Sequence, residues 1–156
     1  EQCKDCADLC IRSQQDADEL MKVFNGFRNC VLTELDYLSG AYVQPALAMY
    51  PINAKRRVRM VFQRQDKNLP AIELVFCDTS RLNLVPIRTN CTAEITGAVL
   101  AYQGGRLYWA DRDDFVIDNI NKDPAVNQAT WIEAKRAQWR VLKDHLGAGH
   151  VYEVTK

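Results

Sequence analysis

The sequence lacks a long hydrophobic run, and it lacks an excess of charge of either sign. In its 156 residues no apolar stretch approaches the roughly 18 residues that a membrane-spanning helix requires. Twenty lysines and arginines are balanced by twenty aspartates and glutamates, so the whole molecule has no net field to draw it toward polyanions. We therefore expect neither a membrane span nor a nucleic acid partner.

Histidine is also scarce, and no catalytic signature accompanies it. His145 and His150 are the only two histidines, and both lie near the end of the chain. No GxSxG or HExxH pattern marks a nucleophile or a metal site, and Gly104-Gly105 is a lone pair that does not make a phosphate-binding loop. These absences predict that the protein is not an enzyme, that it has no catalytic residue, and that it uses no metal or cofactor.

One acidic segment, WADRDDFVID, carries carboxylates at Asp111, Asp113, Asp114 and Asp118. Such a cluster can bind calcium, but Phe115 stands where the EF-hand pattern needs a third oxygen ligand, and no suitably placed glycine or glutamate follows. We interpret the segment as a solvated acidic loop or a protein-binding loop.

A basic stretch lies between residues 55 and 68, where six lysines and arginines are opposed only by Asp66. On a strand, Arg57 and Arg59 project from the same face. That face is either a half-solvated sheet surface or an anion-binding strip. The balanced total charge favours the solvated surface.

Cysteine, by contrast, is abundant, with three of six residues in the opening EQCKDCADLC. A thioredoxin-like pair needs a buried strand before it, and only two residues precede Cys3. A metal site would need a second CxxC pair, which is missing. The even number favours disulfides in a secreted or periplasmic protein whose signal peptide has been removed. The predicted disulfide cysteines are Cys3, Cys6, Cys10, Cys30, Cys77 and Cys91.

The cysteine pairing is constrained by distance. An intervening strand of about six residues at roughly 3.3 Å each would hold Cys77 and Cys91 on the order of 20 Å apart, well beyond the roughly 7 Å limit for bonded Cα atoms. Cysteines three or four apart on one helix are also poorly directed for a bridge. We therefore expect the three N-terminal cysteines to bond to Cys30, Cys77 and Cys91, with the order left open.

Hydrophobic periodicity predicts a helix at each end of the chain. Apolar residues recur at steps of three and four over residues 5–39, with a possible break at Asn25-Gly26 and an end at Gly40. Near the C-terminus, Asp123 can cap a helix that Pro124 begins and Gly147 ends. Residues 41–53 contain two prolines and are expected to form a short helix or loop over the core. The predicted C-terminal stripe is Ile132, Trp139, Leu142 and Leu146.

Between these helices the period changes to two. RVRMVFQ and AIELVFC alternate like half-buried strands, and further strands are expected at residues 82–88, 92–102 and 106–110. Gly104-Gly105 supplies a tight hairpin turn between the last two. Short connections favour antiparallel neighbours. The predicted fold is a single α+β domain over residues 1–156: an N-terminal helical segment, a five-stranded antiparallel meander, and a C-terminal helix packed on the sheet, stapled by disulfides.

The function that fits this composition is binding of another protein, as an inhibitor, an immunity-type neutraliser or a surface recognition domain. Aromatic and arginine side chains dominate interface hot spots, and rim carboxylates can steer a basic partner. One alternative is a small-molecule sensor or carrier, with Tyr102, Tyr108 and Trp109 lining a pocket between sheet and helix. A small hydrolase is the least favoured. The predicted binding residues are Tyr102, Arg106, Tyr108, Trp109, Asp111, Arg112, Asp113 and Asp114.

Overall fold

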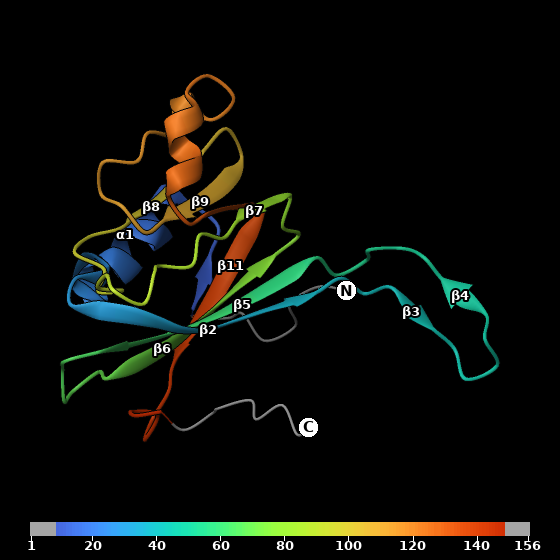
Figure 1. The fold of residues 1–156 in the computed structure, drawn as a ribbon, viewed down its shortest axis with the longest axis horizontal. Coiled ribbons are helices and arrows are strands. Elements are labelled where there is room, and N and C mark those ends of the chain that lie inside the picture. Colours follow the sequence, from blue (N-terminus) through green and yellow to red (C-terminus); the bar gives the residue numbers. More distant parts are fainter. Residues whose placement is uncertain (1–8, 149–156) are drawn as a thin grey trace.

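The computed structural model describes residues 9–148, which form three antiparallel sheets and one α-helix (Figure 1). The five-stranded sheet has the order β1-β11-β6-β5-β2, and the four-stranded sheet has the order β7-β10-β9-β8. The third sheet is the two-stranded hairpin β3-β4. The helices are α1 (Gln14–Val23) and the 3-10 helices η1 (Asn25–Phe27), η2 (Ile117–Asn119) and η3 (Pro124–Gln128). The strands are β1 (Cys10–Ile11), β2 (Cys30–Leu38), β3 (Tyr42–Val43), β4 (Met49–Tyr50), β5 (Arg57–Arg64), β6 (Ala71–Cys77), β7 (Arg81–Asn83), β8 (Val99–Gln103), β9 (Arg106–Ala110), β10 (Trp131–Ala134) and β11 (Arg136–Val141).

The two larger sheets share one core, because the chain passes directly from one sheet to the other twice. β6 leads into β7 through residues 78–80, and β10 leads into β11 through Lys135 alone. The Ser80 N–H donates to the carbonyl of Glu133, and the Lys135 N–H donates to that of Cys77, so the two crossings lie beside each other. The packed side chains between the sheets and α1 include a chain of edge-on and tilted rings: Phe24, Phe27, Phe62 and Trp109.

The α+β prediction of two terminal helices around a meander is wrong, and the N-terminal half shows one reason. The helix occupies only Gln14–Val23, where the Ser13 hydroxyl accepts from the Asp16 N–H. Asn25, Gly26 and Phe27 then adopt positive φ values of 51°, 64° and 62°, which end the helix. The following CVLTELDYL forms β2. Val31, Leu35 and Leu38 fit a helical spacing, but the segment pairs with β5 as a strand, with a bulge between Leu32 and Glu34 that breaks the alternation.

The predicted C-terminal helix is wrong for a related reason. Asp123 does cap a turn, since its carboxylate accepts from the Ala125 N–H, and Pro124 does begin it. The turn is the short η3, however, and it is followed by β10 and β11. Trp139 lies in β11 opposite Leu74 of β6 and is half-buried against the core. The capping signals at Asp123 and Pro124 produce only one short turn, because the residues that follow pair as the strands β10 and β11.

The predicted strands RVRMVFQ and AIELVFC are confirmed as β5 and β6, and residues 106–110 are confirmed as β9. Gly104 and Gly105, with φ values of 61° and 77°, make the two-residue turn between β8 and β9, as type I′ geometry requires. The strands do not form one meander, because β7, β8 and β9 belong to the second sheet. The strands expected at 82–88 and 92–102 are shorter, as β7 and β8.

The predicted disulfide pairing, which joined the N-terminal cysteines to Cys30, Cys77 and Cys91, is also wrong. Cys30, Cys77 and Cys91 are thiols, and no disulfide joins any two residues of the described range. Cys30 and Cys77 are buried in the β-rich core, whereas Cys91 is exposed on the loop before β8. Cys10 lies in β1, and Cys3 and Cys6 lie outside the described residues. The bridges expected from the N-terminal cysteines to these three positions are therefore absent, and no disulfide between described residues links the two sheets.

Candidate binding surfaces

The aromatic residues of the predicted site mostly stabilise the four-stranded sheet. Trp109 is fully buried, with 0% of its surface exposed, and contacts Phe27 and Phe62. Tyr108 is buried, and its hydroxyl donates to Glu133 Oε2 at 2.8 Å. Tyr102 is half-buried against the core. All three rings occupy packed positions. Tyr102 and Tyr108 therefore do not line the ligand pocket between sheet and helix that the sequence predicted.

Glu133 holds the predicted hairpin end together. It accepts hydrogen bonds from Tyr108 and from Ser80, and Ser80 Oγ also accepts from Arg106 at 3.2 Å. Burial acts to raise the pKa of Glu133, but the hydrogen bonds outweigh it and the pKa lies below its usual value. Burial and the bond to Glu133 raise the pKa of Tyr108 to about 12. The cluster is a satisfied structural network in which Ser80 and Arg106 are exposed and Tyr108 is buried.

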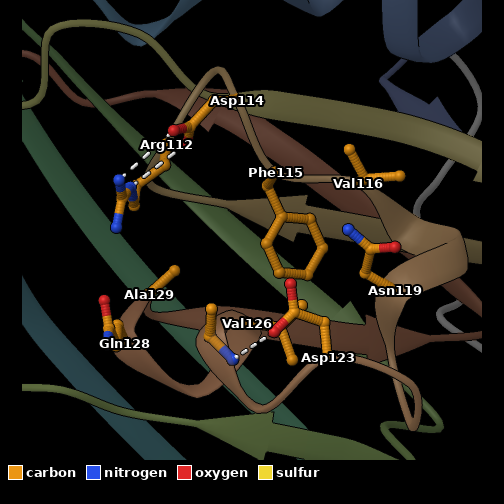
Figure 2. A pocket seen from close by; sticks show the side chains of 10 residues that line it. Arg112, Asp114, Phe115, Val116, Asn119, Asp123, Val126, Gln128 and Ala129 are labelled. Carbon is orange, nitrogen blue, oxygen red and sulfur yellow. Dashed lines mark hydrogen bonds and ion pairs between the residues drawn. The ribbon is translucent and has the colours of Figure 1, made fainter.

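The acidic loop lies apart from that network and borders a polar pocket of about 230 Å³. Figure 2 shows Arg112 and Asp114 paired on one side, with Phe115 across the middle and Asn119 and Asp123 opposite. Arg112 Nε lies 3.2 Å from Asp114 Oδ1, so the pair neutralises itself. Asp123 is engaged as the cap of η3. Asp113 is exposed beside Gly97. The pocket therefore offers little unpaired charge to a ligand.

Half of the cations of the basic stretch are paired with carboxylates, and Arg59 makes most of these contacts. Arg59 contacts Glu34, Asp36 and Glu73, with Nε lying 2.6 Å from Glu73 Oε2. Glu73 also accepts from Arg140 at 2.8 Å. These pairs cover the solvent-facing side of β2, β5, β6 and β11 with interlocked charges of both signs. Arg56 and Arg64 also pair with carboxylates, Asp78 and Asp66. The paired arginines interrupt the basic stretch along the chain, which favours the solvated-surface interpretation.

The most exposed apolar surface is one that sequence reasoning placed over the core. Residues 40–54, which we call the arm, contain the β3-β4 hairpin and project away from both larger sheets (Figure 1). Every residue from Ala41 to Ala54 is exposed. Leu47 and Met49 expose 83% and 71% of their surface. The large apolar side chains exposed on the arm are Tyr42, Val43, Leu47, Met49, Tyr50 and Ile52.

The arm is ordered by its own contacts and by its base. The rings of Tyr42 and Tyr50 stack with centroids 5.0 Å apart. At the base, the carbonyl of Ser39 accepts from the N–H groups of Lys55 and Arg56. Gly40 has φ of 93°, and a Cβ there would lie 2.7 Å from the Lys55 nitrogen, so only glycine fits without a shift. These contacts keep the arm extended in a defined direction.

A second apolar feature lies beside the outer edge of β2. We call it the β2 groove; it has a volume of about 270 Å³. Leu84 and Ile87 on its rim are exposed, and β2 is the last strand of its sheet, bridged on its outer side at Cys30 by Ile95. The lining residues are Leu32, Thr33, Glu34, Leu35, Leu84, Val85, Pro86, Ile87, Ala93, Ile95, Trp109 and Asp111.

The two carboxylates in the groove are already engaged. Glu34 pairs with Arg59 at 3.1 Å, and Asp111 accepts from the Thr130 N–H at 3.1 Å. Burial raises the pKa of Asp111, although that hydrogen bond opposes the rise. The Nε1–H of Trp109 has no acceptor among the described residues. The groove thus combines an apolar lining with an unused hydrogen-bond donor in one of its lining residues.

The described residues contain no group of three or more histidine, cysteine, aspartate or glutamate side chains placed to hold a metal. Within the same range, no helix has the length and apolar character needed to cross a membrane. Of the predicted binding residues, Trp109 and Asp111 lie in the β2 groove and Arg112 and Asp114 in the polar pocket. The arm was missed, although its run of residues without charge was a signal that could have found it.

Comparison with known proteins does not narrow these alternatives: no family model, no curated protein and no solved structure matches the chain.

Proposed function

We propose that this protein is a protein-binding module and that the arm is its principal contact surface. The observation that carries this proposal is the concentration of exposed apolar surface on the arm. Among the described residues, six of the sixteen exposed large hydrophobic side chains lie there, and Tyr37 and Leu38 adjoin its base. Contiguous apolar surface of this kind typically marks an interaction site, whereas scattered single residues do not.

The shape of the arm supports the same conclusion. A two-stranded hairpin is marginally stable in water on its own, and β3 and β4 pair through only two residues each. Both faces and both edges of this hairpin are without a covering element in the described structure. A partner that covers the side chains and pairs with an exposed strand edge would stabilise it.

A lipid partner is disfavoured by the backbone of the arm. In a bilayer core each unsatisfied backbone N–H or carbonyl costs several kcal/mol, and this short hairpin satisfies few of its own groups internally. A protein surface can supply hydrogen-bonding partners to such a backbone. The arm therefore suits a protein surface better than a membrane.

The alternative function, a small-molecule sensor or carrier, has weaker support. Ligand sites for small molecules usually enclose about 300–1,000 Å³, and the β2 groove and the polar pocket enclose about 270 and 230 Å³. Trp109 is the one residue of the three predicted to line a ligand pocket that borders either of them. Export of the protein stays a prediction. Disulfides were its main support, and no disulfide joins two of the described cysteines.

The proposal is tested with three immobilised forms of the protein: wild type, the arm variant Leu47→Glu/Met49→Glu, and the control Val116→Glu. Val116 is also an exposed apolar residue, but it lies by the polar pocket. Each form is exposed both to extract of the native source and to the untagged wild-type chain. We expect wild type and control to retain the same protein at a defined stoichiometry and the arm variant to lose it. Equal retention of protein by all three forms, or retention by none of them, would overturn the proposal.

A further inference from the structure

We infer that the partner of the arm is a second copy of this chain, and that the arm of one copy docks in the β2 groove of the next. This inference rests on the proposed function, because it names the partner of the same surface. Its starting point is that one chain carries two apolar features of opposite shape. The arm is a projecting hairpin, and the β2 groove is a concave site on the body.

The two features match in charge. Residues 40–54 contain no aspartate, glutamate, lysine, arginine or histidine. In the groove, Glu34 and Asp111 are held by partners of their own chain, and the loop segment at residues 82–87 is uncharged. An uncharged arm can therefore enter the groove without leaving a charge buried and unpaired, which would cost several kcal/mol.

The two features also match in size. The groove encloses about 270 Å³, too little for most drug-sized ligands but suited to one or two aliphatic side chains. Leu47 and Met49 are the most exposed large hydrophobic residues of the chain's described part, and they lie at and just after the turn of the hairpin. These two side chains are the ones we assign to the groove of the neighbouring copy.

The backbone of β2 gives the arm a second means of attachment. β2 ends the five-stranded sheet, and apart from the bridge between Cys30 and Ile95 no described strand pairs with its outer side. Leu32 to Leu35 belong both to this edge and to the groove lining. A strand of the arm lying along this edge would gain main-chain hydrogen bonds while its side chains enter the groove.

The direction of the arm separates it from the groove of its own chain. The groove residues of β2, Leu32 to Leu35, lie in the middle of the strand, whereas the arm begins beyond its C-terminal end at Leu38. In Figure 1 the arm continues away from the sheets past that end. One molecule therefore presents both surfaces uncovered, and a contact between copies covers both of them.

The test is complementation between two variants that each lack one surface. The arm variant is Leu47→Glu/Met49→Glu and the groove variant is Leu84→Glu/Ile87→Glu, with Val116→Glu as the control. Circular dichroism first checks that each is folded; the milder Leu47→Ser/Met49→Ser and Leu84→Ser/Ile87→Ser replace any that is not. Masses in solution are then measured by light scattering over a range of concentrations, with one variant isotopically labelled for native mass spectrometry.

We expect wild type and control to form assemblies larger than one chain, and each variant alone to associate at least about tenfold more weakly. A mixture of the two variants keeps one intact arm and one intact groove, so it should form a heterodimer containing one chain of each. A mixture that stays monomeric, or an arm variant that assembles like wild type, would overturn the inference. If wild type is monomeric but captures a different protein through the arm, this inference fails while the proposed function stands.

Discussion

At the scale of single residues, Glu73 shows how a charged side chain is accommodated on a strand that is buried along its whole length. Its carboxylate lies between Arg59 and Arg140, at 2.6 and 2.8 Å from their Nε atoms. Burial acts to raise the pKa of Glu73, but the hydrogen bonds from Arg140 and Arg59 outweigh it and lower the pKa from its usual value. The group is therefore a source of stability that depends on pH.

The first prediction concerns the substitution Glu73→Gln, which should lower the free energy of unfolding by about 1–3 kcal/mol at neutral pH. Because the pKa of Glu73 is lower in the folded than in the unfolded chain, its contribution is complete above about pH 4.5 and is lost as the pH falls through the folded value. Urea unfolding of both proteins at several pH values checks this. A difference that stays constant down to pH 2 would contradict the proposed ion pairs.

The second prediction concerns the cysteines. Burial raises the pKa of Cys30 to about 12, although Arg64 opposes the rise, and only the thiolate reacts with alkylating reagents. In the folded protein at pH 8, iodoacetamide should therefore modify the exposed Cys91 and leave Cys30 unmodified, while unfolding should expose both. Peptide mass mapping measures the two sites separately. Detection of either cysteine in a disulfide of the native protein would contradict the structure.

At the scale of elements, the arm differs from every other strand pair because it contributes nothing to the core. All of its large side chains are exposed, and its hydrogen bonds to the rest of the chain lie at its base. An element that packs on nothing adds no apolar burial to folding. Its ordered turn and stacked tyrosines therefore do not serve core packing, which agrees with the role in binding that we propose for the arm.

The third prediction follows from this separation. Replacing residues 41–53 by Asn-Gly should change the free energy of unfolding by less than about 1 kcal/mol, because the deleted side chains are exposed and the closing loop becomes shorter. Thermal and urea unfolding at low protein concentration provide the measurement. A loss of several kcal/mol would show that the arm packs on its own body, and it would remove the basis of the proposed function.

The fourth prediction concerns the direction of the arm. Substituting Gly40 by valine places a Cβ against the Lys55 nitrogen and forces a side chain into a positive φ, so the base of the arm must shift. We expect self-association to weaken while the near-ultraviolet circular dichroism of the core is retained. Gly104→Val, at the β8-β9 turn, is the matched control because it also has positive φ but meets no atoms nearby. Equal effects of the two variants on association would argue against a directed arm.

At the scale of the whole molecule, the sequence predicts the regular strands and misses how they combine. β5 and β6 alternate clearly, and Gly104-Gly105 specifies its hairpin, because these signals are local. The conformations of β2 and β11 depend on pairing with partners far along the chain, and the spacing of Val31, Leu35 and Leu38 fits a helix although the segment forms a strand with a bulge. Cysteine number indicated bridges, but Cys30 and Cys77 act as small buried hydrophobic residues.

The candidate binding surfaces were partly predictable. The arginine and aromatic residues predicted a binding surface at the end of the β8-β9 hairpin. In the structure, however, Trp109 is buried in the core and Tyr108 is buried and donates a hydrogen bond to Glu133. A sequence cannot distinguish an aromatic residue that packs inside from one that is presented to a partner, because both satisfy the same alternation. Residues 41–53 were interpreted as a short helix or loop over the core because of their two prolines, and that interpretation places their apolar residues in buried contact with the core. In the assembly that we propose, that burial takes place between molecules.

Amide hydrogen exchange of the wild-type protein at low and high concentration tests the central claim, contact between arm and groove of different copies, most directly. The account predicts that the amides of the arm, at residues 42–50, and those of the β2 groove, at residues 32–35 and 84–87, become protected together as the protein concentration rises. Exchange in the β5-β6 pair should change little. Exchange in the arm that is equally fast at every concentration at which larger assemblies are present would contradict it.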